Sequence, residues 1–461
     1  MNAFLGNVVY LSVADMLSKG LNFFAQIYLA RRLGVEGFGQ INLALALLTY
    51  FALITDFNLT TIGTRDVARS KDPVGYASSF VTLRLALSML AFGLLLVFVF
   101  FLPKPPEMKL LIILFGLSLF PSAILLEWFF NGIESMGYLA VSRVIRAAVF
   151  LGLLLLAMFL GRLTVYVIAL IYAASWLSSM TVQVYWLTRN DRTLRLQYDL
   201  DHWRQLLRDA APLGLSVVMI QVFANLDTVM LGFLKSDQAV GWYSAGYRIV
   251  ATLVSFASVF VNPLYPVLAR HSASPDELRR VLFSALKLLL FLGLPIAVGG
   301  MILGDPLLVF LYGEDYRNSV MPFQVLIWKV LIVYAALPFS YCLYACNKGK
   351  EFFYSVAVAA CVNPLLNYVL ISHYGLVGAA AATLTTDCIL LTMYCVFSQR
   401  VVSIPVQDLL ARPLIASVMM GLAVLSVPVH VVLRIVLGVA VYLCVVLSFK
   451  WVVKNDIDRI H

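Results

Sequence analysis

Long, nearly uninterrupted apolar segments recur along almost the whole chain of 461 residues. About 20 apolar residues cross a bilayer as one helix, and about fourteen segments approach that length. They cover residues 7–30, 40–62, 76–102, 109–130, 138–160, 163–187, 210–234, 241–268, 280–303, 320–345, 352–372, 375–398, 406–428 and 430–453. The run at 306–312 is too short to cross, so it either continues the ninth segment or re-enters. Because the runs are continuous rather than alternating, they predict helices and not strands.

The composition makes the bilayer the solvent for most of these helices. Hydrophobic residues make up 62% of the chain and charged residues 12%, whereas soluble domains carry roughly 25% charged residues. The net charge of +9 comes from Lys and Arg in short loops, with no long basic arm, so it does not indicate nucleic-acid binding. The predicted fold class is an all-α integral membrane protein with about 14 transmembrane helices.

The distribution of Lys and Arg predicts the orientation. With the N-terminus inside, the inner loops hold about nineteen of them and the outer loops about eight. We therefore expect a multi-pass protein of the inner (cytoplasmic) membrane with both termini in the cytoplasm. The first segment contains Asp15 and Lys19 and is too long for a signal peptide, so it is expected to be a retained helix.

The chain reads as two related lobes joined by its longest polar stretch. Gly37-Phe38-Gly39 matches Ala239-Val240-Gly241, Asp72-Pro73 matches Ser274–Glu277, and Pro121 and Asn131 match Pro338 and Asn347. Six helices separate equivalent points, so the halves form a parallel repeat. The expected parts are an N-terminal lobe (1–187, helices 1–6), a cytoplasmic linker (188–209), a C-terminal lobe (210–398, helices 7–12), and two extra helices with a short cytoplasmic tail (399–461).

The linker contains a short amphipathic pattern. One helical face would carry Leu200, Trp203, Leu206 and Leu207, and the opposite face Arg204 and Arg208. Such a pattern is typical of a helix that lies in the inner headgroup layer. An ordinary solvated linker is the alternative.

Ionisable residues inside the apolar segments are the candidate functional residues. A charge at mid-bilayer costs about 2.5–3.5 kcal/mol, so it should face protein or water. Five cations are expected to line a hydrated, positively charged cavity between the lobes and to bind substrate: Lys19, Arg84, Arg146, Arg248 and Lys329. Alternatively, Lys19 pairs with Asp15 and Arg146 extends to the headgroups. Asp15, Glu127, Asp227 and Asp387 are either counter-ions or proton or sodium sites, and Asp56 is expected at a helix end.

No pattern in the chain indicates catalysis, a cofactor or a metal. Histidines such as His202, His271 and His373 fall in loops or at helix ends, and no Gly-rich phosphate loop appears. Cysteines lie in apolar runs without CxxC spacing. We expect no enzyme activity. A cationic cavity selects an anionic head group, and an attached apolar tail can stay in the lipid, as in a diphosphate-linked sugar.

Several sequence blocks resemble the polysaccharide transporter (O-antigen flippase) family of the multidrug/oligosaccharidyl-lipid/polysaccharide exporter superfamily. These blocks are Ala30–Gly39 (ARRLGVEGFG), Asp56-Phe57, Gly63–Arg69 (GTRDVAR), Leu226-Asp227, Asn363–Asn367 (NPLLN) and Tyr374–Thr383 (YGLVGAAAAT). The first block is fairly specific, whereas small residues such as those of the last also serve helix packing. The resemblance covers nearly the whole chain.

The resemblance implies a two-lobed transporter that moves polyprenyl-diphosphate-linked oligosaccharides to the outer leaflet by alternating access, for surface polysaccharide biosynthesis. One alternative is a multidrug exporter of the same superfamily, which should have an acidic cavity. Another is a membrane-embedded oligosaccharide polymerase or glycosyltransferase, which should have a large polar outer loop. A scaffold without transport would not need the buried charges.

Overall fold

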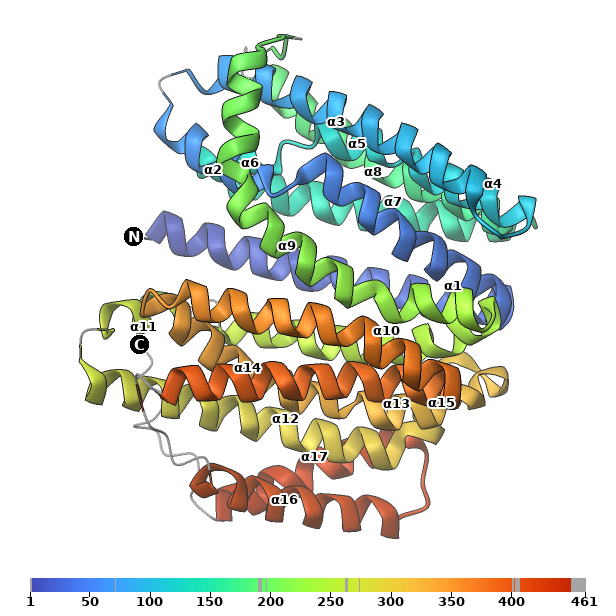
Figure 1. Ribbon diagram of the computed structural model, residues 1–461. Helices are drawn as coiled ribbons and strands as arrows, with labels where there is room; N and C mark the ends of the chain where they lie inside the picture. Colours follow the sequence, from blue (N-terminus) through green and yellow to red (C-terminus); the bar gives the residue numbers. More distant parts are fainter. Residues whose placement is uncertain are drawn as a thin grey trace. The chain divides into compact units, whose positions relative to one another are not determined.

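In the computed structural model every regular element of the described residues is a helix (Figure 1). The described residues are 2–448 without 71, 190–192, 196, 262–263, 273, 400–401 and 403–406; the side chains of 2–12, 212–213, 216, 258–259 and 407–408 are not described. The elements are α1 (Asn2–Asp56), α2 (Leu59–Arg69), α3 (Pro73–Phe101), α4 (Pro106–Gly116), α5 (Leu119–Ile124), α6 (Glu127–Gly132), α7 (Met136–Phe159), α8 (Val165–Arg189), α9 (Leu200–Leu234), α10 (Asp237–Val261), α11 (Leu264–Arg270), α12 (Pro275–Tyr312), η1 (Glu314–Ser319), α13 (Val320–Leu326), α14 (Trp328–Ala345), α15 (Gly349–Gln399), α16 (Gln407–Ser426) and α17 (Val431–Ser448).

The helices confirm the fold class of a helical multi-pass membrane protein. Within the described residues, eleven helical stretches are long and apolar enough to cross a bilayer. Two helices, α1 with 55 residues and α15 with 51, are long enough to cross the bilayer twice, because about 20 residues suffice for one crossing. Each is divided at a glycine with positive φ, Gly34 (φ 69°) or Gly375 (φ 57°), where the ribbon reverses direction (Figure 1). The number of fourteen crossings stays a prediction.

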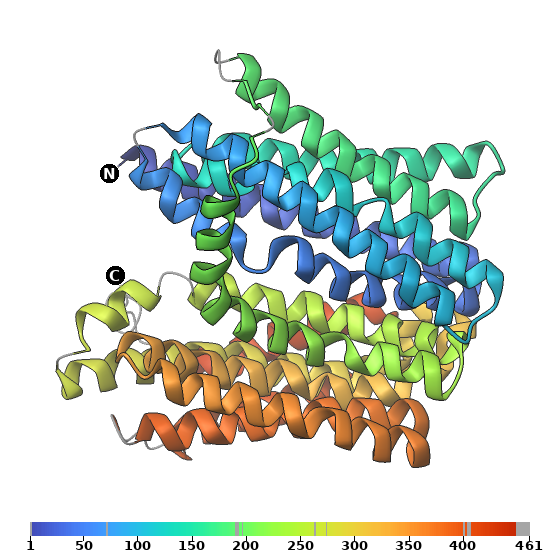
Figure 2. The same ribbon diagram turned by 45° about the horizontal axis from the view of Figure 1, so that its top comes forward.

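Contacts divide the chain into two compact units, Met1–Val229 and Met230–His461. The division by contacts falls within α9, after Val229, whereas the predicted C-terminal lobe begins at residue 210; the predicted lobes stay a prediction. The beginning of α9 runs across the other helices of the first unit before the chain turns to run along them (Figure 2). Trp203, Leu206 and Leu207 pack against the unit's buried aromatic core. The apolar face predicted for the headgroup layer therefore contacts protein, while Leu200 is 74% exposed and Arg204 and Arg208 are exposed.

A broken helix lies at the centre of the first unit. The predicted span 109–130 consists of α4, α5 and α6, with Leu125 extended between the last two. Backbone groups freed at membrane depth need other partners. Gln183 Oε1 accepts a hydrogen bond from the Leu126 amide (2.6 Å), and Trp128 Nε1 donates to the Leu125 carbonyl (3.1 Å). The break places Glu127 at the start of α6.

In the second unit, the last two helices pack against α12. Leu303 of α12 joins Ala416, Met420 and Tyr442 in one buried cluster, and the Tyr442 hydroxyl donates to the Phe291 carbonyl (2.7 Å). The short run at 306–312 continues α12, which is one of the two outcomes expected from the sequence.

Candidate functional site

A polar cavity of about 460 Å³ lies inside the first unit. Both arms of α1 line it, one through Asp15, Ser18, Lys19 and Asn22 and the other through Ala52, Thr55 and Asp56. The remaining wall comes from α2, α3, α5–α8 and residue Leu125, through Thr60, Arg84, Ser122, Leu125, Glu127, Arg143, Arg146 and Trp176. The reversal at Gly34 is what brings the two arms of α1 to the same space.

Arg143 connects two carboxylates in this cavity. Its Nη2 lies 2.6 Å from Glu127 Oε2, and its Nη1 lies 3.7 Å from Asp15 Oδ1. Asp15 also pairs with Lys19, whose Nζ lies 2.8 Å from Asp15 Oδ2. These side chains are 22–40% exposed, so water reaches them. The local Lys19–Asp15 pair that the sequence left open is present, within a network that also includes Arg143.

Arg84 is the most buried cation of the cavity, with its side chain 8% exposed. Its Nη1 donates to the Leu125 carbonyl (3.3 Å), and its Nη2 donates to the Ser122 carbonyl (3.3 Å) and lies 3.4 Å from Asp56 Oδ1. The two carbonyls belong to the break between α5 and α6. Arg84 therefore stabilises the broken helix and positions Asp56, which also accepts from Thr60 Oγ1 (2.5 Å).

Arg146 differs from the other cations of the cavity. Its guanidinium carbon lies 4.3 Å from the centre of the Trp176 ring, and no carboxylate of the described residues lies within 4.0 Å of it. Arg146, Trp176 and Asn22 also line a second cavity of about 180 Å³ in the same unit. A cation held by an aromatic face keeps its N–H groups available to an anion.

The charges of the larger cavity nearly balance. Lys19, Arg84, Arg143 and Arg146 face Asp15, Asp56 and Glu127. This cavity of the first unit is therefore an ion-pair network with one excess positive charge. Of the predicted site residues, it brings together Lys19, Arg84, Arg146, Asp15 and Glu127.

The other predicted residues occupy different places. In the second unit, Lys329 Nζ lies 2.7 Å from Asp387 Oδ2, and the side chains are 15% and 8% exposed. Asp387 is thus a counter-ion of Lys329, one of the two roles considered for it. Arg248 lies half-buried in α10, and Asp227 is buried in α9.

The sequence analysis did not identify Trp176 or Arg143 as site residues. Arg143 and Arg146 are three residues apart on α7, a spacing that puts both side chains on one helix face. That spacing could have identified Arg143. Trp176 carries no such signal, because its partner is 30 residues away on a different helix.

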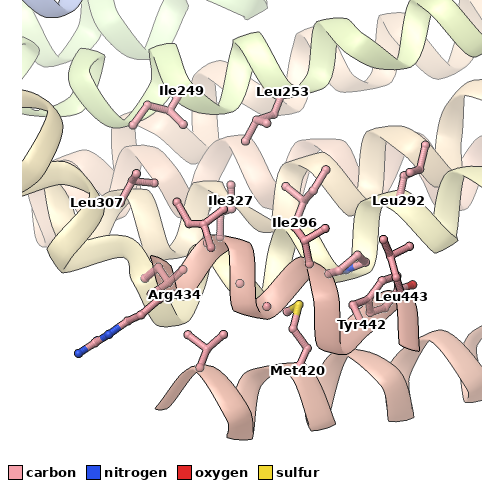
Figure 3. A pocket seen from close by; sticks show the side chains of 18 of the residues that line it. Ile249, Leu253, Leu292, Ile296, Leu307, Ile327, Met420, Arg434, Tyr442 and Leu443 are labelled. Atoms are coloured by element: carbon pink, nitrogen blue, oxygen red, sulfur yellow. The ribbon is translucent and has the colours of Figure 1, made fainter. Parts of the chain in front are cut away.

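A second kind of cavity, apolar and of about 350 Å³, lies in the second unit between α10, α12, α13, α16 and α17 (Figure 3). Aliphatic side chains such as Ile249, Ile296 and Leu443 line it together with Met420. Arg434 is its one charged lining residue, and its guanidinium points away from the cavity in Figure 3. Such a lining suits hydrocarbon rather than a polar head group.

Comparison with known proteins identifies a family of polysaccharide biosynthesis proteins, and similar relatives and structures. The family profile described as "Polysaccharide biosynthesis protein" matches residues 4–272, and the profile "MatE" matches residues 212–369. The chain is 22% identical to the probable low-salt glycan biosynthesis flippase Agl15 of Haloferax volcanii over 87% of this chain and 84% of the relative. It is 23% identical to the putative O-antigen transporter of Escherichia coli K12 over 85% and 95%.

Solved structures share the fold. The lipid II flippase MurJ in an inward closed conformation superposes with a TM-score of 0.79 at 17% identity, covering 96% of this chain and 98% of that one. An inward-facing multidrug resistance MATE family transporter of the MOP superfamily gives a TM-score of 0.68 at 15% identity, covering 86% and 98%.

Proposed function

Because the chain belongs to the polysaccharide biosynthesis protein family, we propose that it is a flippase for a polyprenyl-diphosphate-linked oligosaccharide. It would carry this lipid from the cytoplasmic to the outer leaflet by alternating access, for surface polysaccharide biosynthesis. The relatives named as a glycan flippase and an O-antigen transporter support this proposal over most of their lengths. No covalent step is part of the proposed activity.

The observation that carries the proposal is the charged cavity within the membrane-spanning helices of the first unit. Charges at membrane depth are costly, so four cations around one hydrated space need a function or compensation. Three carboxylates compensate most of them, and Arg146 is held over Trp176 instead. A diphosphate would receive N–H donors from Arg146 and Lys19 and release Lys19 from Asp15.

The roles of the predicted residues divide accordingly. We assign diphosphate binding to Arg146, Lys19 and Arg143, and a positioning role to Arg84, since its donors already serve the break between α5 and α6. Arg248 stays a candidate for substrate binding in the second unit, whereas Lys329 is paired with Asp387 and is assigned to stability. The apolar cavity of the second unit suits the polyprenyl tail.

Ion coupling is a separate part of the proposal. Asp15 and Glu127 share Arg143, so protonation of either carboxylate would weaken one arm of the network. Asp227 and Asp387 are the other candidates for a proton or sodium site. Transport driven by a pH gradient, by a sodium gradient or by neither distinguishes these cases in proteoliposomes.

The proposed location is the inner membrane with both termini in the cytoplasm. It rests on the distribution of Lys and Arg over the loops. A reporter enzyme fused after residue 461 and active only in the cytoplasm tests this orientation. Activity of a periplasm-dependent reporter at the same position would contradict it.

The central experiment is a translocation assay. Purified protein in liposomes receives a polyprenyl-diphosphate oligosaccharide in one leaflet, and a membrane-impermeant lectin reports its arrival in the other. Arg146→Gln should reduce translocation strongly, whereas Arg162→Gln, at an exposed position, should not. Export of a lipophilic cationic dye with no lipid translocation would instead support the multidrug exporter alternative.

A further inference from the structure

An aromatic cavity of about 470 Å³ lies in the second unit and shares no lining residue with the apolar cavity described above. Its rings come from α11, the last turns of α14, and the two arms of α15: Tyr265, Tyr341, Tyr344, Phe352 and Tyr394. Val333, Ala336, Leu337 and Ser340 complete the lining, so none of its lining residues is charged. Its volume lies within the range of roughly 300–1,000 Å³ typical of small-molecule sites.

The rings of this cavity are arranged as a platform. Phe352 stacks on Tyr394 with ring centres 5.5 Å apart and planes 6° apart, and Tyr344 lies 4.5 Å from Phe352. Tyr265 and Tyr341 pair with centres 6.2 Å apart. The electron-rich face of an aromatic ring attracts the weakly positive C–H groups of a sugar ring, which such a platform can pack against.

Hydroxyl groups give the platform a polar component. The phenol oxygens of Tyr265, Tyr344 and Tyr394 form no hydrogen bond with any residue that the structure describes; Tyr265 and Tyr344 are 44% and 45% exposed, and Tyr394 is 7% exposed. Each can donate one hydrogen bond and accept others, which matches the hydroxyl groups of a sugar.

The position of the cavity also fits a glycan. Its rings flank the connection between α14 and α15, where Lys348 and Lys350 place the chain on the cytoplasmic side by the positive-inside rule. Tyrosines of an aromatic belt face lipid, and Tyr265 and Tyr344 are 44% and 45% exposed, whereas Tyr394 is 7% exposed and does not fit such a belt. A cage for an organic cation surrounds its ligand with ring faces, whereas Phe352 and Tyr394 stack on each other.

We propose that this aromatic cavity binds uncharged sugar residues of the lipid-linked oligosaccharide at the cytoplasmic side. The proposal rests on the proposed flippase function and assigns the sugar part of the substrate to the second unit, apart from the diphosphate site of the first. Tyr344 and Tyr394 supply hydroxyl groups, and Phe352 supplies a stacking face.

The test compares two probes: a polyprenyl diphosphate bearing a neutral disaccharide, and the same polyprenyl diphosphate without sugar. Dissociation constants are measured for the full chain in nanodiscs. The wild type should bind the sugar-bearing probe about tenfold more tightly. Tyr344→Phe with Tyr394→Phe should reduce that ratio to about two, since each variant removes one hydroxyl and keeps the ring.

Matched variants separate the possible failures. Arg146→Gln should weaken both probes by a similar factor and leave the ratio intact, and Phe352→Leu should lower the ratio without affecting the sugar-free probe. A ratio that stays near ten in the tyrosine double variant would overturn the sugar site while leaving the flippase proposal standing. Failure of both probes to bind the wild type would overturn the flippase proposal and the sugar site together. The wild type is also tested for binding of tetramethylammonium. If it binds and Phe352→Leu does not, while the affinity ratio of the two polyprenyl diphosphate probes stays unchanged, the cavity is assigned to cations instead.

Discussion

Two charged sites, one in each unit, hold their side chains in opposite ways. In the second unit, Lys329 and Asp387 form a close pair, 15% and 8% exposed. In the first unit, Lys19, Arg143 and Asp15 share a network whose members are 25–40% exposed, and Arg146 lies beside it on an aromatic ring. A closed pair has its charge satisfied by the protein, whereas an open network can exchange partners with a ligand. The difference separates residues that stabilise the fold from residues that can bind an anion.

The largest expected effect comes from breaking the closed pair. Lys329→Met leaves Asp387 buried without this partner, and removing one member of a buried pair costs about 3–5 kcal/mol. The free energy of unfolding in detergent should fall by that amount. The double variant Lys329→Met/Asp387→Leu should recover most of the loss. Equal destabilisation in the single and double variants would show that a buried Asp387 without Lys329 is not the cause of the loss.

A smaller loss of stability is expected at Arg84. Arg84→Gln removes one donor each from the Ser122 and Leu125 carbonyls. These carbonyls keep the Leu125 amide and Trp128 Nε1, respectively, as donors, so the cost is that of the two lost hydrogen bonds, about 1–3 kcal/mol in all. The chain should unfold at a lower denaturant concentration, and Arg84→Lys should restore only part of the difference because Lys lacks the planar fork. Unchanged stability in Arg84→Gln would contradict its positioning role.

Arg146 should show the reverse pattern. Arg146→Gln removes a cation that has no carboxylate partner among the described residues, so the free energy of unfolding should change by less than about 1 kcal/mol. Translocation should fall at least tenfold, because a charge-assisted hydrogen bond contributes about 1.5–3 kcal/mol. A variant that transports normally, or that loses stability instead of transport, would show that Arg146 does not bind the substrate.

The smallest effect is expected at the start of α9. Arg204 and Arg208 are exposed, so replacing both by Gln should change stability by less than about 0.5 kcal/mol. Trp203→Ala should cost more, since this side chain packs on the buried core and donates to the Ser79 carbonyl (3.2 Å). Thermal melting of the two variants side by side measures the difference. A larger loss in the arginine variant would mean that the polar face stabilises this helix.

The sequence predicted the helices far better than the partners of their charges. Apolar length alone located the membrane segments, because the bilayer demands it at every crossing. The pair Lys329–Asp387 joins residues 58 positions apart, and Arg84 meets carbonyls made available by a helix break; neither follows from local spacing. Lys19 and Asp15 were foreseeable as partners, because four residues separate them on one helix.

The sequence also could not predict what the apolar face of residues 200–209 contacts. Periodicity gives the face but not what covers it, and Trp203 and Leu206 could have contacted lipid as well as protein. In the structure they pack on the aromatic core of the first unit.

The most direct test of the account measures how tightly a sugar-free polyprenyl diphosphate binds to two variants in nanodiscs. One is Arg146→Gln, and the other is Lys329→Met/Asp387→Leu, which removes both charges of the closed pair. We expect at least tenfold weaker binding to the first variant and binding within twofold of the wild type for the second. Normal binding to Arg146→Gln together with lost binding to the double variant would contradict it.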